Sequence, residues 1–287
     1  MWFAFIFISA TFSALSMVSM KLGVKNADPI LASAINAIVV LVISWTVVFA
    51  NGTQTQLLEI DSRTLVFLVL SGLATGGVGI ANYGALKIGD VDTYVGVVRC
   101  SMVLTVILSF VILGDPLTRT SGIGAVFVLV GTVLMIDRRS RTSGEPVSKR
   151  WIALMVVAIA LSSTATLLGK VGISDIDSNL GTAMFALSIV VLANGLALTT
   201  GKWHQAKDLS RRELLVILLS GVFYAGMELT FYAGLKLQLT SIVMPVDKLL
   251  SGLITVIMAY MVFGEKVNKR AATALCLIAV GSFLIMM

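Results

Sequence analysis

The sequence predicts an all-α polytopic membrane protein with ten transmembrane helices, arranged as two inverted repeats of five helices. Three observations lead to this prediction: the composition, an internal repeat, and an odd number of apolar segments in each copy. The chain of 287 residues is 57% hydrophobic and only 13% charged, with a mean hydropathy of +0.99. A water-soluble domain of this length could not bury so much apolar surface, so the solvent of this chain must be largely lipid.

The repeat becomes visible when the chain is shifted against itself by 149 residues. This shift aligns Trp2 with Trp151, Lys21 with Lys170, Asp28 with Asp177, Ser71 with Ser220, Tyr83 with Tyr232 and Lys87 with Lys236. After one inserted residue the shift becomes 150 and aligns Gly114 with Gly264 and Gly131 with Gly281. Duplication of an apolar unit is typical of membrane transporters. We therefore expect a first repeat over 1–143, a basic linker over 144–150 and a second repeat over 151–287.

Charged residues, glycine and proline divide the chain into apolar segments near the length of about 20 residues that a membrane-spanning helix needs. The first half is expected to cross at 2–20, 30–50, 64–86, 93–113 and 119–136, and the second at 151–169, 180–200, 213–235, 240–263 and 270–287. Helix is expected because an open strand would leave backbone groups unpaired in lipid. Since five is odd, the second copy crosses in the opposite sense to the first.

The loop charges predict the orientation. Loops on one side of the predicted membrane carry 15 Lys and Arg residues, and loops on the other side carry 4. Under the positive-inside rule, this bias predicts a multi-pass protein of the plasma (cell inner) membrane with both termini outside the cytoplasm. The net charge of +6 belongs to these loops, so we expect the lipid bilayer and a small-molecule substrate as partners and no nucleic acid. A monomer with internal pseudo-two-fold symmetry is the expected state.

Four ionised side chains fall inside the predicted spans: Arg99, Glu228, Asp247 and Lys248. A charge in hydrocarbon costs several kcal/mol unless it faces water or a partner, so all four are candidate substrate-binding residues. At about 1.5 Å per residue, Glu228, Asp247 and Lys248 reach similar depths and could meet. Neighbouring residues differ by about 100° around a helix, so only one of Asp247 and Lys248 is expected to face a narrow site.

Each charge also has a structural interpretation. Lys248 could be a counter-ion that pairs with Glu228 and fixes helix packing. Arg99 could extend toward the inner interface, but it has no obvious acid partner, which makes it the stronger candidate for substrate contact.

Further candidates are polar residues near span ends and breaks in helix regularity. Asn82, Tyr83 and Tyr232 could form a hydrogen-bonding or cation–π wall of a binding site, or the tyrosines could anchor the interface. The candidate hinge residues are Gly76, Gly77 and Gly79 in a glycine-dense stretch and Pro245, which removes a backbone donor within a span. No metal-ligand cluster or nucleophile–base pair is present in the sequence, and His204 is the single histidine. We therefore expect no enzyme activity, no metal and no cofactor.

The chain resembles the EamA domain of the drug/metabolite transporter superfamily, with one domain in each half. The resemblance lies in Leu70-Ser71-Gly72-Leu73-Ala74-Thr75-Gly76, Ala85-Leu86-Lys87-Ile88-Gly89-Asp90, Val103-Leu104-Thr105-Val106-Ile107-Leu108, Gly114-Asp115, Pro245-Val246-Asp247-Lys248-Leu249 and Phe263-Gly264-Glu265. It implies a central cavity walled by spans 1, 3, 4, 6, 8 and 9, with spans 5 and 10 packing the halves together.

The resemblance also implies a secondary transporter that moves a small polar or charged metabolite, such as an amino acid or an organic anion, by alternating access. The basic residues on spans 4 and 9 are similar to those of the organophosphate antiporters of this superfamily. The alternative is a flippase for a lipid-linked cargo such as a polyprenyl-phosphate derivative. The two would differ in whether Arg99 points into an enclosed cavity or into a cleft open to lipid.

Overall fold

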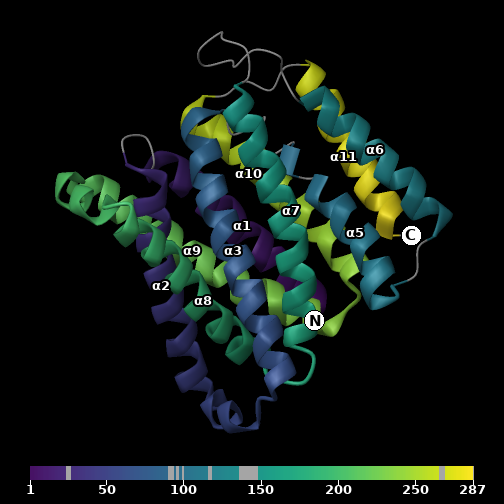
Figure 1. Ribbon diagram of the computed structural model, residues 1–287. Helices are drawn as coiled ribbons and strands as arrows, with labels where there is room; N and C mark the ends of the chain where they lie inside the picture. The colour runs from purple at the N-terminus through teal and green to yellow at the C-terminus, as the bar shows by residue number, and fades with distance from the viewer. Residues whose placement is uncertain are drawn as a thin grey trace.

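The computed structural model describes residues 1–23, 27–89, 94, 97–98, 100–115, 118–135, 148–264 and 269–286. Every regular element within these residues is helical (Figure 1). The first half contains α1 (Trp2–Gly23), α2 (Pro29–Asn51), η1 (Thr53–Glu59), α3 (Ser62–Ile88), α5 (Cys100–Leu113) and α6 (Arg119–Met135). The second half contains α7 (Lys149–Gly172), α8 (Ser178–Thr199), η2 (Lys202–Asp208), α9 (Arg211–Leu237), α10 (Thr240–Phe263) and α11 (Lys269–Met286).

Each predicted span overlaps one of the α-helices, although part of the fourth span lies outside the described residues. In the described part of the chain, seven of them are long and apolar enough to cross a membrane: α1, α2, α3, α7, α8, α9 and α10. The chain is therefore a multi-pass membrane protein. Shorter apolar helices lie at Cys100–Leu113, Arg119–Leu134 and Ala272–Ile285. Before Cys100, the fourth predicted span is described only at Tyr94, Val97 and Val98, all of which are helical.

Polar side chains cap the first turns of five of these helices. Asp28, Asp61 and Asp177 accept hydrogen bonds from backbone N–H groups in the first turns of α2, α3 and α8. Ser148 and Ser210 do the same for α7 and α9. The first N–H groups of a helix have no partner within it, so a short oxygen-bearing side chain at this position determines where the helix starts.

Asp28 also pairs with a cation from the other half of the chain. Nζ of Lys202 in η2 lies 3.0 Å from Oδ2 of Asp28. Partial burial acts to raise the pKa of Asp28, but the hydrogen bond and charge of Lys202 and the backbone N–H of Ile30 outweigh it and hold the pKa below its usual value. The carboxylate therefore stays ionised at neutral pH and ties η2 to the start of α2.

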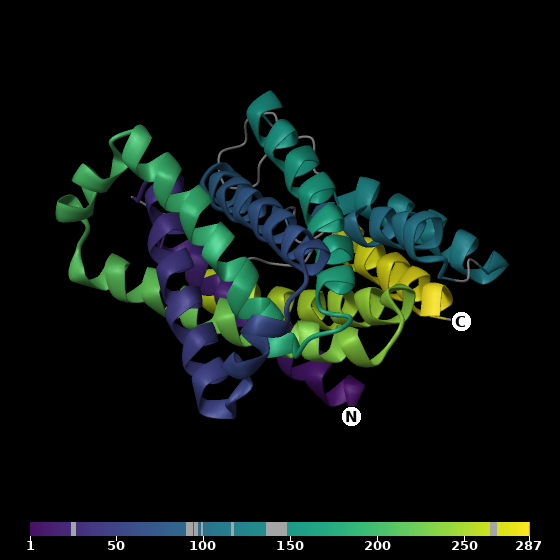
Figure 2. The same ribbon diagram turned by 60° about the horizontal axis from the view of Figure 1, so that its bottom comes forward.

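The two halves interlock. α1 packs along α9 and α7 packs along α3, so each half gives helices to the other. α2 packs against α8 on one side of the bundle, and α6 packs against α11 on the opposite side (Figures 1 and 2). Reciprocal contacts of this kind arise when a two-fold axis relates equivalent elements.

The repeat-related helices α6 and α11 pack against one another in opposite directions. A Cβ added at Gly124 would meet Gly281, whereas one added at Gly131 would meet Ala274. Residue numbers therefore rise along α6 as they fall along α11. The close contact of these two helices agrees with the expectation that spans 5 and 10 pack the halves together.

Repeat-related lysines cap the carboxyl ends of α3 and α9. Lys21 of α1 donates to two carbonyl oxygens at the end of α3, and Lys170 of α7 donates to their equivalents at the end of α9. The acceptors are Leu86 and Gly89 in the first half and Leu235 and Gln238 in the second half. The last carbonyl groups of a helix have no partner within it, so these contacts stabilise the helix ends. We call these two regions of the bundle the Lys21 end and the Lys170 end.

Replacing Lys170 by Met should lower the free energy of unfolding by about 1–3 kcal/mol, because two carbonyl groups lose a charged donor. The variant Lys21→Met should have an effect of similar size, since the contacts repeat. Thermal unfolding of purified protein in detergent measures both. Lys207→Met, at an exposed position in η2, is the control; a Lys170→Met protein as stable as this control would show that the lysine contacts do not stabilise the fold.

Candidate functional site

A cavity lies between the two halves. Its lining comes from α1, α3, α7, α9 and α10, and from Tyr94 and Val98 of the fourth span. The empty space, counted with any part open to solvent, is about 1030 Å³. These are the spans that the family resemblance implied for a central cavity, and both halves contribute to it.

Three of the four predicted ionised residues line this cavity. Glu228 comes from α9, and Asp247 and Lys248 come from α10. The exposed fraction is 6% for Glu228 and 2% for Asp247. Because a buried charge without a partner is strongly unfavourable, the partners of these groups decide what the cavity can bind.

Asp247 and Lys248 form an ion pair. Nζ of Lys248 lies 3.5 Å from Oδ2 of Asp247, and Oγ of Ser9 donates to Oδ1 of Asp247 at 3.1 Å. Both residues are among those that line the cavity, and the expectation that only one of them is central to a narrow site stays a prediction. The structure also pairs Lys248 with Asp247, whereas the sequence had suggested Glu228 as its counter-ion.

Glu228 lies among aromatic side chains of its own helix. Tyr224, one turn earlier on α9, interacts with the Glu228 carboxyl through its hydroxyl. Phe231 and Tyr232, on the next turn, line the same cavity. Across the described residues, Glu228 has no Lys or Arg nitrogen within 4.0 Å, although the charge of Lys248 acts on it at longer range.

The other polar candidates divide between cavity and packing. Asn82 and Tyr232 line the cavity, whereas Tyr83 is not part of its lining. The Tyr83 hydroxyl of α3 lies 3.1 Å from Oγ of Ser220 on α9, and Tyr232 of α9 interacts with the hydroxyl of Ser71 on α3. The two repeat-related tyrosines therefore join the same two helices from both directions, and only Tyr232 also reaches the cavity.

The hinge candidates lie within continuous helices. α3 runs without a break through Gly76, Gly77 and Gly79, and α10 runs through the buried Pro245. A Cβ at these glycines would approach Leu192, Leu161 and Ser33, respectively. These glycines thus allow close packing with other helices; a hinge at these positions or at Pro245 stays a prediction. Arg99 lies outside the described residues.

The sequence analysis missed most of the apolar lining of the cavity. This lining includes Met17, Met20, Tyr94, Tyr224, Met227 and Phe231. A signal for part of it was present, since Tyr224 and Phe231 stand four residues before and three residues after Glu228. Residues at these spacings share one face of a helix. The spacing therefore predicts that Tyr224 and Phe231 line the same site as Glu228.

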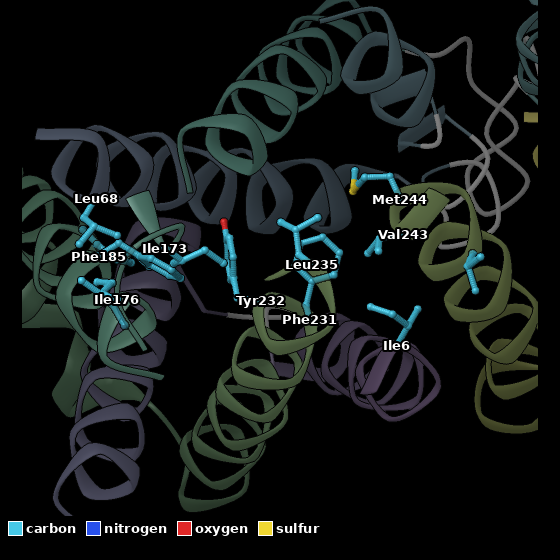
Figure 3. Close-up of a cluster of buried hydrophobic side chains, with 14 of the residues drawn as sticks. Ile6, Leu68, Ile173, Ile176, Phe185, Phe231, Tyr232, Leu235, Val243 and Met244 are labelled. Atoms are coloured by element: carbon cyan, nitrogen blue, oxygen red, sulfur yellow. The ribbon is translucent and has the colours of Figure 1, made fainter. Parts of the chain in front are cut away.

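A buried apolar cluster lies toward each of the two ends of the bundle, and each cluster shares residues with the cavity lining, such as Phe231 and Tyr94. At the Lys170 end, the cluster includes Ile6, Phe231, Leu235 and Val243 from α1, α9 and α10 (Figure 3). At the Lys21 end, the cluster includes the repeat-related residues Met155, Leu86 and Tyr94. On α9, Leu235 follows the cavity residue Tyr232, and on α3, Leu86 follows the cavity residue Asn82. The two clusters therefore contain repeat-related residues toward opposite ends of the bundle.

Comparisons with known proteins agree with this architecture. Residues 1–137 and 149–287 match the EamA-like transporter family. An "uncharacterized transporter in cobO 3'region" of Sinorhizobium sp. is 34% identical over 134 residues, which cover 47% of this chain and 95% of that protein. The relative is therefore about as long as one repeat. A solved crystal structure of a protein covers 97% of this chain and 94% of its own chain with a TM-score of 0.70; at 16% identity this shows similarity of fold alone.

Proposed function

This chain belongs to the EamA-like transporter family, and on that premise we propose that it is a secondary transporter of a small polar or charged metabolite that works by alternating access. In this proposal ten helices, as two inverted repeats of five, cross the plasma membrane with both termini outside the cytoplasm. The antiparallel packing of α6 on α11 supports the inverted arrangement. The distribution of Lys and Arg among the loops supports the orientation.

The observation that carries the proposal is the cavity between the halves with a repeat-related apolar cluster at each end. Alternating access needs two closures, of which one opens while the other holds. Equivalent closures formed by oppositely directed helices would face opposite sides of the membrane. Loosening the cluster at the Lys170 end would then open the cavity to one side of the membrane. Loosening the cluster at the Lys21 end would open the same cavity to the other side.

The flippase alternative requires a basic residue that faces a cleft open to lipid. Arg99, the residue expected to distinguish the two functions, lies outside the described residues. Lys248, the cation in the described lining, is paired with Asp247 and is less available to a lipid phosphate. The described part of the site therefore favours a small solute.

Uptake into proteoliposomes tests the proposal. Purified protein is reconstituted, and uptake of a panel of labelled amino acids, organic acids and amines is measured; saturable uptake of at least one solute is expected. Ser162→Trp, which places a large side chain in the cavity from α7, should abolish that uptake. Thr164→Trp, on the exposed surface of the same helix, should retain it. Equal uptake by the two variants would contradict transport through this cavity.

A further inference from the structure

We infer that the substrate binds close to α3 and α7, with its hydrogen-bonding groups toward these two helices and its apolar part toward α1 and α9. The substrate class is then an amphipathic solute with a hydrogen-bonding head and an apolar body. This inference rests on the proposed transport function and adds to it the side of the cavity that selects the substrate.

Repeat-related faces of α3 and α9 line the cavity. The shift of 149 residues relates lining residues of α3 to lining residues of α9, in the pairs Thr75 and Tyr224, Val78 and Met227, and Asn82 and Phe231. Residues three or four positions apart lie on one face of a helix, so the two helices present the same face to the cavity. In each of these pairs the α9 side chain is the larger one.

The same difference separates α1 from α7. Met17 and Met20 line the cavity from α1, and the repeat-related residues on α7 are Thr166 and Gly169. All four helices are described over their whole length, so each position on one helix has a described counterpart on the other. Because α1 packs along α9 and α7 packs along α3, the large side chains gather on one pair of helices and the small ones on the other pair.

We name these two sides of the cavity by their helices. The α1–α9 wall consists of Met17, Met20, Tyr224, Met227, Glu228 and Phe231. The α3–α7 wall consists of Thr75, Val78, Asn82, Ser162, Ala165 and Thr166. Two repeats related by a pseudo-two-fold axis would leave equal space beside equivalent helices if their side chains were alike. Since the side chains of the α1–α9 wall are larger, the empty space lies closer to the α3–α7 wall.

The two walls also differ in chemistry. The α3–α7 wall carries the amide of Asn82 and the hydroxyls of Thr75, Ser162 and Thr166, which are uncharged groups that donate and accept hydrogen bonds. Apart from Glu228, the α1–α9 wall consists of methionine and aromatic side chains. Methionine adapts to apolar shapes of different size, and aromatic rings offer a large apolar area. A solute in this space therefore meets hydrogen-bonding groups on one side and apolar surface on the other.

Three uncharged amides test this placement: acetamide, 3-methylbutanamide and 3-phenylpropanamide. They share one hydrogen-bonding head and differ in the size of the apolar body, and they form no ion pair with charged groups of the cavity. A ligand that binds the folded state raises its unfolding temperature, so thermal unfolding is measured with each amide at millimolar concentration. We expect stabilisation to increase with the size of the body, because a larger body buries more apolar surface.

Repeat-related serines supply a matched pair of variants. Ser13 on α1 and Ser162 on α7 both line the cavity, and replacement by Ala removes the same hydroxyl from opposite sides. Ser162→Ala should weaken binding of 3-phenylpropanamide about fivefold, the scale of one hydrogen bond. Ser13→Ala should bind it as the unchanged protein does, because the head of the ligand faces α7.

The position of the empty space is tested on α3. Val78→Met gives α3 the residue that α9 carries at the repeat-related position and fills space beside the α3–α7 wall. It should weaken binding of 3-phenylpropanamide about fivefold or more, the lower end of the cost of overpacking, and should affect the short acetamide less. Val66→Met, at an exposed position of the same helix, is the control and should bind all three amides as the unchanged protein does.

Three results would overturn the inference. One is no stabilisation of the unchanged protein by 3-phenylpropanamide, a result that needs no variant to fold. The second is equal affinity for this amide in Ser162→Ala and Ser13→Ala, and the third is equal affinity in Val78→Met and Val66→Met. Uptake of a solute that Ser162→Trp abolishes, together with equal serine variants, would leave the transport function intact and reject only the placement. Amide binding that differs between the serine variants, without uptake of any solute, would do the reverse.

Discussion

Replacing Gly72 by Ala should lower the free energy of unfolding by about 3 kcal/mol, because the added methyl group has no room. A Cβ at Gly72 on α3 would lie 2.2 Å from the carbonyl oxygen of Phe185 and 2.7 Å from Cβ of Ser188, both on α8. The carbonyl belongs to a helix backbone and cannot turn aside as a side chain could. The two helices would have to separate along their contact, which joins the first half of the chain to the second.

Two further glycines give this prediction a graded test. Gly221, the repeat equivalent of Gly72, would bring its Cβ 2.8 Å from Cβ of Val39 on α2, a less severe overlap than the 2.2 Å at Gly72. A Cβ at Gly195 on α8 would meet nothing within 4 Å, and Ala there should be neutral or stabilise by up to about 1 kcal/mol through its higher helix propensity. We expect the loss of thermal stability to be largest for Gly72→Ala, smaller for Gly221→Ala and smallest for Gly195→Ala. Equal stability of the first and last variants would contradict the close approach of α3 and α8.

Replacing Asp247 by Asn should also destabilise the protein, by about 1–3 kcal/mol, because it leaves the Lys248 ammonium without its counter-ion. This range lies below the value for a fully buried pair because the Lys248 side chain is 25% exposed and partly screened by water. Ser9→Ala removes only one hydrogen bond to Asp247 and should cost about 1 kcal/mol. The free energies of unfolding of the unchanged protein, Asp247→Asn and Ser9→Ala are compared by denaturant or thermal unfolding in detergent.

A double-mutant cycle tests whether the two charges depend on one another. Lys248→Met in the Asp247→Asn background removes the unpaired ammonium, so the double variant should be more stable than the sum of the single effects predicts. Strictly additive effects would show that the contact at 3.5 Å contributes no coupling energy.

The regular part of the fold was predictable because its causes are local in the sequence. Apolar runs of spanning length, interrupted by charge and glycine, mark the helices, and the capping residues Asp28, Asp177 and Ser210 mark their starts. The repeat found in the sequence also appears in the contacts: Lys21 bonds to the end of α3, and Lys170, 149 residues later, bonds to the equivalent end of α9. Neither η1 nor η2 was expected, since the short helices lie in polar loops where no hydrophobic period indicates structure.

The candidate site was predictable in its membership but not in its pairings. Glu228, Asp247 and Lys248 stood out because ionised groups are rare in apolar spans, and all three line the cavity. Asp247 and Lys248 point in different directions from the helix axis, yet the long lysine side chain brings its Nζ to 3.5 Å from Oδ2 of Asp247. Tyr83 and Tyr232 are equivalent in the repeat, but only Tyr232 reaches the cavity.

By itself the sequence determined that this chain is helical, membrane-spanning and duplicated, because composition and hydrophobic spacing follow from the amino acids alone. Only the tertiary structure decided that α1 packs on α9 and α7 on α3, and that Ser9 and Lys248 both bind Asp247. The helix contacts and the Ser9–Asp247 hydrogen bond join residues far apart in the chain, so they depend on how the helices pack. The pair of neighbours Asp247 and Lys248 depends on how far the lysine side chain reaches.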